Sequence, residues 1–158
     1  MSSDTASSDT TSVERIIPAP AAAIFALLAD PERHRDIDGS GTVREAPGGS
    51  QLLTLGSTFG MKMKMGLPYS MVNTVVEFEP DRRIAWQTAK KLGPLGTMGG
   101  RIWRYELEPV EGGTLVRETW DISQERVKAA VRPLRTKTIA GMTKTLARIE
   151  EIVTAAEA

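Results

Sequence analysis

The sequence contains no cysteine and only one histidine. Without cysteine the chain forms neither disulfides nor thiolate metal sites, and it has no cysteine nucleophile. This composition is compatible with a reducing cytoplasm. The single histidine, His34, cannot build a zinc site alone, because carboxylates would have to converge on it from elsewhere. We therefore expect no metal site and no cofactor.

An excess of either charge and a long apolar run are also missing. The 20 basic residues balance 20 acidic ones over 158 residues, whereas nucleic-acid-binding domains usually carry a basic excess. The longest apolar stretch, around 20–29, is too short to span a bilayer, and the N-terminus lacks the basic region and apolar core of a signal peptide. We expect a cytoplasmic protein, monomeric or weakly dimeric, that binds no nucleic acid and has no integral membrane segment.

The chain is long enough for one domain with a sizeable core. Residues 1–11 consist mainly of serine, threonine, aspartate and alanine. They have almost nothing to bury and are predicted to form a disordered N-terminal arm. No internal repeat or second domain is evident further along, so the sequence predicts a single domain over 12–156.

The spacing of apolar residues alternates between period two and helical spacing. It predicts strands at 12–17, 42–46, 52–65 (interrupted at Gly56), 69–79, 84–88, 101–108 and 114–122, and helices at 21–29, 31–36 and 124–156. Asp121 or Ser123 can cap the start of the last helix. Pro133 lies inside this helix and should kink or divide it.

This order of elements makes a doubly wound sheet unlikely, because helical connections between adjacent parallel strands are missing. We expect an α+β fold: a curved antiparallel sheet of about six to seven strands wrapped around a long C-terminal helix, with two short helices after the first strand. Side chains do not easily fill the interior of such a sheet. We therefore expect an internal cavity between sheet and helix.

Three parts of the chain together resemble one superfamily. They are residues 13–20 with 24–33 behind them, the hairpin at 76–86, and residues 113–120. In these parts the chain resembles the helix-grip (SRPBCC) superfamily, which groups START lipid-transfer domains, the major birch pollen allergen and the bacterial polyketide cyclase/dehydrase-like proteins, and it is similar to this last branch. The resemblance covers residues 12–156. It implies the sheet, helix and cavity expected above. Many members bind or transfer apolar ligands, and a minority are enzymes.

Residues 59–65 alternate strictly between apolar and other residues. The apolar positions are Phe59, Met61, Met63 and Met65. Period two puts them on one face of a strand, and that face should point toward the C-terminal helix. Methionine is flexible and polarizable, so it suits adaptable binding surfaces, but it also fills ordinary cores. The stripe is therefore either a ligand-contacting wall or core packing.

Aromatic residues fall on three consecutive predicted strands and should form a cluster, which either lines a ligand site or packs a core. The expected ligand-contacting residues of this cluster and of the surrounding elements are Trp86, Trp103, Tyr105, Trp120, Val76, Phe78, Glu118, Leu134 and Met142.

Glu118 is the strongest polar candidate in the sequence. It shares a predicted strand face with Val116 and Trp120, so its carboxyl group should point inward, where burial would raise its pKa and let it act as an acid or hydrogen-bond donor. Alternatively, the alternation is reversed, or Arg101 or Arg104 on the neighbouring strand pairs with it.

His34 and Tyr105 complete the catalytic candidates. As a general base, His34 would have to face the cavity and reach a substrate proton. Its neighbours at 32–36 are charged, which suggests an exposed turn and a surface or capping role.

These observations support three hypotheses. The first is binding or transport of a hydrophobic small molecule or lipid in the internal cavity. The second is a polyketide cyclase/dehydrase-like enzyme that uses Glu118, Tyr105 or His34 as acid or base. The third is a partner-binding module that uses the basic residues at 126–148, which also fit an ordinary solvated helix face. We favour the first.

Overall fold

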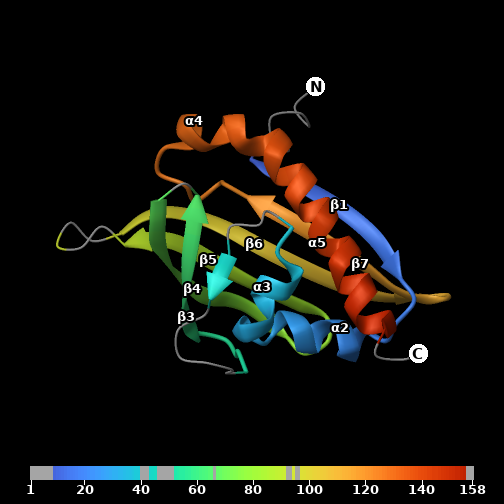
Figure 1. The fold of residues 1–158 in the computed structure, drawn as a ribbon. Coiled ribbons are helices and arrows are strands. Elements are labelled where there is room, and N and C mark those ends of the chain that lie inside the picture. Colours follow the sequence, from blue (N-terminus) through green and yellow to red (C-terminus); the bar gives the residue numbers. More distant parts are fainter. Residues whose placement is uncertain are drawn as a thin grey trace.

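The computed structural model describes residues 9–39, 43–45, 52–65, 67–91, 94 and 97–155, with side chains at all of these positions except 43–45, 61–65, 67–70, 91, 97 and 98. Seven strands form one antiparallel sheet in the order β1-β7-β6-β5-β4-β3-β2. The sheet curves, and the helices lie against one of its faces, with α5 running across it (Figure 1). The predicted α+β fold is confirmed.

The elements follow the predicted order with shifted ends. They are β1 (Thr10–Ile17), α2 (Ala21–Leu28), η1 (Pro31–Arg33), α3 (His34–Ile37), β2 (Val43–Glu45), β3 (Thr58–Met65), β4 (Leu67–Glu79), β5 (Arg83–Lys91), β6 (Thr97–Val110), β7 (Gly113–Asp121), α4 (Lys128–Val131), η3 (Arg132–Leu134) and α5 (Arg135–Ala155). The first part of the strand expected at 52–65, residues 52–55, does not form. Its Leu53 is nevertheless buried, and its backbone N–H donates to the Ala29 carbonyl.

Proline divides the C-terminal helical segment as predicted. Pro133 lies in the 3-10 turn η3, between α4 and α5, because its ring cannot continue an α-helix. The predicted cap is wrong. Asp121 Oδ1 accepts hydrogen bonds from the backbone N–H and hydroxyl of Ser123 and so closes a turn at the end of β7. The helix starts later, at Lys128.

The first strand starts earlier than expected. Thr10 and Thr11 pair with β7, and the Asp9 carboxylate accepts from Lys128 at 3.2 Å and Arg132 at 3.3 Å. Residues 9–11, expected in a disordered arm, therefore belong to the fold. The rest of that arm, residues 1–8, lies outside the described residues.

Buried apolar side chains from the sheet and from both helical regions form the main core, among them Ile24 and Leu28 of α2, Ile84 and Val116 of the sheet, and Leu146 and Ile149 of α5. None of the helices in the described part of the chain is long and apolar enough to cross a membrane.

A close contact between Gly39 and α5 fixes the end of α3. The Gly39 backbone N–H donates to Thr145 Oγ1 at 2.9 Å. A Cβ atom at this position would clash with the carbonyl oxygen of Gly141 and the backbone of Thr145. Glycine is thus required for α3 to reach α5, and this approach holds His34 over the sheet.

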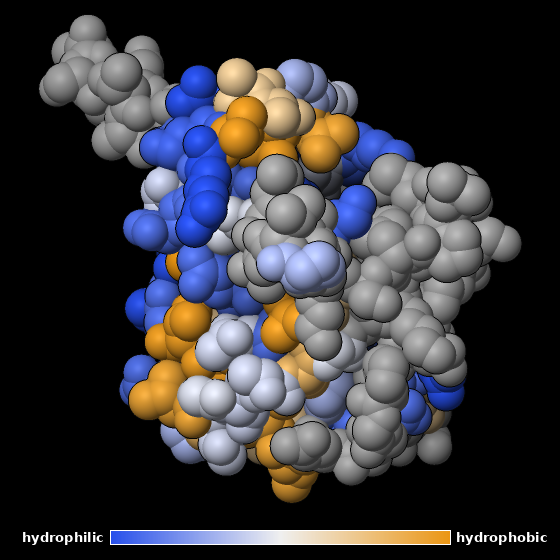
Figure 2. All heavy atoms as spheres, turned by 90° about the vertical axis from the view of Figure 1, so that its left-hand side faces the viewer, coloured by the Kyte–Doolittle hydropathy of each residue, from blue (hydrophilic) through white to orange (hydrophobic). Residues whose placement is uncertain are grey.

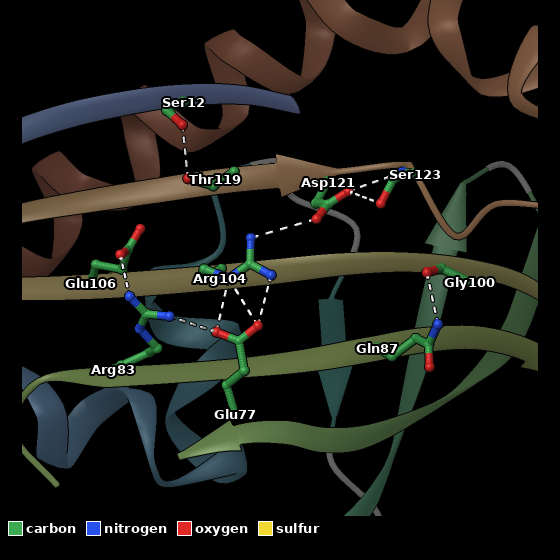
Figure 3. A network of polar contacts seen from close by, with 10 residues as sticks. All are labelled: Ser12, Glu77, Arg83, Gln87, Gly100, Arg104, Glu106, Thr119, Asp121 and Ser123. Carbon is green, nitrogen blue, oxygen red and sulfur yellow. Dashed lines mark hydrogen bonds and ion pairs between the residues drawn. The ribbon is translucent and has the colours of Figure 1, made fainter. Parts of the chain in front are cut away.

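The face of the sheet turned away from α5 carries a network of ion pairs over four strands (Figure 3). Arg104 of β6 donates to both carboxylate oxygens of Glu77 on β4, at 2.9 Å and 2.7 Å, and contacts Asp121 of β7 at 3.5 Å. Arg83 of β5 joins Glu77 to Glu106. The network therefore ties β4, β5, β6 and β7 together from outside.

Apolar side chains are exposed at the α4 end of the molecule, where Figure 2 shows orange atoms gathered beside blue ones. Val127, Leu134 and Ile139 are 52%, 39% and 37% exposed, and the segment 126–148 has seven basic and no acidic residues. The expectation that Leu134 faces the interior is wrong, because Leu134 sits in the turn that Pro133 introduces and lies outside the buried clusters.

Candidate functional site

Glu118 and Tyr105 form a buried polar pair on the inner face of the sheet. They lie directly opposite each other on β7 and β6, and the Tyr105 hydroxyl donates to Glu118 Oε2 at 2.9 Å. Both residues are almost fully buried, Tyr105 with 5% and Glu118 with 2% of its surface exposed. The expected inward orientation of Glu118 is therefore correct.

Burial raises the pKa of Glu118 to about 8, although the hydrogen bond from Tyr105 acts in the opposite direction. The carboxyl group is consequently mostly protonated near pH 7. The alternative pairing with arginine is wrong, because Arg101 binds Glu125 at 3.2 Å and Arg104 binds Glu77 at 2.7 Å. The neutral Glu118 acid thus faces an interior without a counter-ion on the neighbouring strand.

His34 is buried, contrary to the prediction of an exposed residue. Its ring stacks on Trp86 with 4.8 Å between centroids and meets the edge of Phe59 at 5.5 Å. The reason is that α3 is a single turn whose inner side carries His34 and Ile37, both buried, while its charged neighbours point outward. These two residues are three apart, a spacing that puts them on one side of a helical turn. The charged residues around them led to the wrong prediction of an exposed turn.

The hydrogen bond and burial of His34 define its protonation state. Nε2 lies 2.8 Å from the carbonyl oxygen of Leu28. Burial lowers the pKa of the imidazole to about 4, so the ring is neutral over most of the physiological range.

The predicted aromatic cluster is present. Trp86, Trp103 and Trp120 lie opposite one another on β5, β6 and β7, and the Trp86 and Tyr105 rings are 5.6 Å apart. Trp120 is 2% exposed. Met142 of α5 packs with Trp120 in a smaller buried cluster.

Three buried polar atoms of this region make no hydrogen bond within the described part of the chain: His34 Nδ1, Glu118 Oε1 and Trp120 Nε1. Buried polar atoms are nearly always paired, so each of these requires a physical explanation. His34 and Glu118 contact the rings of Trp86 and Tyr105, whereas Trp120 lies in a second buried cluster against which Trp103 also packs.

A β-bulge changes which residues of β4 face inward. The register shifts between Val75 and Glu77, so Val75 is 1% exposed and Val76 is 37% exposed. The prediction that Val76 lines the interior is therefore wrong. Phe78 lies beyond the bulge and again faces the core, where its ring contacts Phe25 at 5.5 Å.

Asn73 and Thr88 are buried polar residues that the sequence analysis missed. Thr88 Oγ1 donates to Asn73 Oδ1 at 2.7 Å, and Asn73 Nδ2 reaches the Phe59 carbonyl at 3.5 Å. Asn73 faces inward because it lies before the bulge, in phase with Val75. In the sequence, this asparagine alternates with apolar residues, and that alternation could have indicated that it faces inward.

The methionine stripe can be placed only by its backbone. The strand β3 is regular from Thr58 to Met65 and pairs with β4, and Phe59 at its start is 6% exposed. The side chains of Met61, Met63 and Met65 lie outside the described residues, so their role as a ligand wall stays a prediction.

A concave region lies at the surface and has a volume of about 510 Å³. It is lined by Glu79, Arg82, Arg83, Glu106, Leu107, Glu108, Leu115 and Arg117. Two of its arginines already form ion pairs, Arg83 with Glu106 and Arg117 with Glu14. Among the described residues, no three histidine, aspartate or glutamate side chains converge as a metal site. The buried cluster around Glu118 is therefore the stronger candidate.

Comparison with known proteins gives one family. Residues 8–153 match the model of a family described as polyketide cyclase / dehydrase and lipid transport. The uncharacterized protein Rv0088 of Mycobacterium tuberculosis (strain H37Rv) is 42% identical over 107 residues, which are 66% of this chain and 44% of that protein. The chain thus spans less than half the length of the curated relatives it matches.

Solved structures share the fold. Protein Ms6760 from Mycobacterium smegmatis superposes with a TM-score of 0.72 at 16% identity, covering 94% of this chain and 93% of that one. The Polyketide_cyc-like protein Cgl2372 from Corynebacterium glutamicum gives a TM-score of 0.61 at 21% identity, with 93% and 92% covered. At such identities the likeness shows the fold alone.

Proposed function

Since the chain belongs to the polyketide cyclase / dehydrase and lipid transport family, we propose that it binds an apolar small molecule or a lipid between the sheet and α5. The observation that carries this proposal is the set of three buried polar atoms that make no hydrogen bond within the described part of the chain. An internal cavity, a cytoplasmic location and a monomeric or weakly dimeric state are parts of the same proposal.

A packed core would not favour this arrangement. A buried polar atom without a hydrogen bond costs about 1–3 kcal/mol of folding free energy, and the described residues include three such atoms, on His34, Glu118 and Trp120. Apolar side chains of similar shape would avoid that cost. Binding sites, in contrast, are typically apolar and aromatic walls with a few polar groups that orient the ligand. The composition of this region agrees with that of a binding site.

Displacement of the apolar fluorophore N-phenyl-1-naphthylamine tests the proposal. A panel of a sterol, a fatty alcohol, a fatty acid and an aromatic polyketide is titrated against the protein–dye complex. We expect saturable displacement with one site per chain by at least one class, together with a raised melting temperature. Absence of dye binding and of any thermal shift over the whole panel contradicts the proposal.

The second candidate function is acid–base catalysis on such a ligand. It is favoured by the raised pKa of Glu118, about 8, because general acids are most effective when their pKa is near the working pH. Here Glu118 would donate or accept a proton, with Tyr105 holding its carboxyl group in place. Once a ligand is identified, Glu118→Gln should abolish its turnover and retain its binding. Unchanged turnover by this variant would contradict a catalytic role of Glu118.

A further inference from the structure

The hydrogen-bonding role of His34 Nδ1 follows from the bond that the other ring nitrogen makes. His34 Nε2 lies 2.8 Å from the Leu28 carbonyl oxygen. A carbonyl oxygen only accepts, so Nε2 carries the proton of the neutral ring. Nδ1 is consequently a bare acceptor, buried beside Trp86 and Phe59.

Glu118 and Trp120 supply donors. Because Tyr105 donates to Glu118 Oε2, the proton of the neutral acid belongs on Oε1, which then donates. The indole Nε1–H of Trp120 can only donate. The two residues are two positions apart on β7, and successive side chains of a strand alternate between faces, so both point to the same side of the sheet.

These groups are connected in space. The His34 ring stacks on Trp86, the Trp86 ring lies 5.6 Å from that of Tyr105, and the Tyr105 hydroxyl holds Glu118. Burial is the largest cause of the raised pKa of both Glu118 and Tyr105, and the charge of Asp38 also raises both pKa values. Trp120 belongs to a second buried cluster, and Trp103 packs against both clusters and so joins Trp120 to this group.

The cluster contains no buried cation. None of the buried residues that the structure describes is a lysine or an arginine, and the arginines of β6 are bound to Glu125 and Glu77. A carboxylate or phosphate placed here would lose its hydration without a counter-ion, which is costly. The chemistry of the region is thus suited to an uncharged group.

We propose that His34, Glu118 and Trp120 form a recognition subsite for a hydroxyl group on an otherwise apolar, uncharged ligand. This inference rests on the proposed function and adds the chemical class of the ligand. A hydroxyl oxygen accepts from Glu118 Oε1–H or Trp120 Nε1–H, and its proton is donated to His34 Nδ1. A ketone satisfies the donors and leaves His34 unpaired, and a hydrocarbon leaves all three atoms unpaired.

Matched probes test the subsite. Binding of 2-naphthol, 2-methylnaphthalene, 2-naphthoate and 2-naphthylmethylammonium is measured at pH 7 by calorimetry, with 1-dodecanol and laurate as an elongated pair. We expect 2-naphthol to bind about tenfold more tightly than 2-methylnaphthalene, the gain of one or two net hydrogen bonds. Dodecanol should bind more tightly than laurate.

Variants assign the preference to the named atoms. Trp120→Phe and Glu118→Met each remove one donor, and each should lower the ratio of 2-naphthol to 2-methylnaphthalene affinity. Glu118→Gln keeps an acceptor for Tyr105 and a donor for the ligand, so it should retain the ratio. Arg117→Gln, an exposed position on the same strand, is the control that leaves both affinities unchanged. Because the readout is a ratio within one protein, a partly folded variant does not distort it.

Each other result overturns a defined part of this account. Equal binding of 2-naphthol and 2-methylnaphthalene by the unaltered protein overturns the subsite and leaves the proposed function standing. Tighter binding of the carboxylate or ammonium probe overturns the uncharged character of the ligand group. Absence of binding by every probe overturns both the subsite and the proposed function. A ratio that persists in Trp120→Phe and Glu118→Met shows that the preference arises elsewhere.

Discussion

The Tyr105 hydroxyl donates to Glu118 Oε2 at 2.9 Å across two paired strands, and both side chains are buried from solvent. This contact satisfies one carboxyl oxygen of Glu118 and leaves the other, Oε1, without a partner in the described part of the protein. Because burial keeps the acid neutral near pH 7, the pair presents a single free donor to the interior. The predictions below follow from this pair and its neighbours.

Removal of the Tyr105 hydroxyl should raise the pKa of Glu118 further above about 8, since this hydrogen bond is the contact that lowers it. In Tyr105→Phe, Glu118 Oε2 also loses its donor, and the free energy of unfolding should fall by about 1–3 kcal/mol. A ¹³C NMR titration of glutamate carboxyl carbons measures the pKa. The Glu77 resonance, on the opposite face, should titrate as in the unaltered protein. A lowered pKa of Glu118 would refute this account of the pair.

The stability of the protein should depend on pH through Glu118 with a defined sign. The folded pKa of about 8 lies above the ordinary value of 4.5, so the folded state binds more protons between these values and stability falls as pH rises through this window. His34 acts in the opposite direction. Its folded pKa of about 4 lies below 6.5, so its contribution to stability is fully present above pH 6.5 and is lost as pH falls toward 4.

Glu118→Gln isolates the first of these two effects. The stability of the unaltered protein relative to this variant should fall by about 2 kcal/mol between pH 6.5 and pH 8, from the slope of about 1.4 kcal/mol per pH unit for one proton. Urea unfolding curves at several pH values measure this difference. A constant difference across the window would show that Glu118 ionises normally.

The His34 imidazole should remain neutral at pH 5.5 with its proton on Nε2. Burial against Trp86 keeps the ring neutral, although the hydrogen bond to the Leu28 carbonyl raises the pKa. That hydrogen bond places the proton on Nε2. Because the chain contains one histidine, long-range ¹H–¹⁵N spectra of the imidazole give an unambiguous titration. We expect an apparent pKa of about 4. A value near 6.5, or a proton on Nδ1, contradicts the assigned acceptor role.

Much of the fold could be predicted from the sequence because its elements carry strong local signals. Period two in β6 and β7 put Tyr105 and Glu118 on inward-facing positions, and register then brought them opposite each other. Pro133 marked the division of the C-terminal helices correctly.

The failures have specific physical causes. A bulge inserts one extra residue and reverses the phase of a strand, so Val75 rather than Val76 is buried in β4. No apolar pattern within 69–79 reveals where such an insertion lies. His34 was misplaced because a one-turn helix shows too few residues for its inner face to be recognised. Its burial depends on the close approach of Gly39 to α5, a long-range contact.

The outer network should stabilise the sheet more than an exposed ion pair does. Glu77 accepts three hydrogen bonds from Arg104, whose side chain is 18% exposed. Glu77→Gln should therefore lower the free energy of unfolding by about 1–3 kcal/mol, as expected for hydrogen bonds between charged groups. The matched control is Glu14→Gln, which breaks the more exposed pair with Arg117 and should cost at most about 1 kcal/mol. If chemical denaturation gives equal losses of unfolding free energy for the two variants, the network stabilises the sheet no more than an exposed ion pair does.

A hydroxylated apolar molecule should enter the region between sheet and helix beside Glu118. Isotope-filtered NOE spectra of the ¹³C-labelled protein with unlabelled 2-naphthol test this directly. We expect contacts from the naphthol ring to the aromatic protons of Trp120, Tyr105 and Trp86. Contacts confined to exposed residues such as Val127 and Ile139, or no contacts at saturating 2-naphthol, would contradict it.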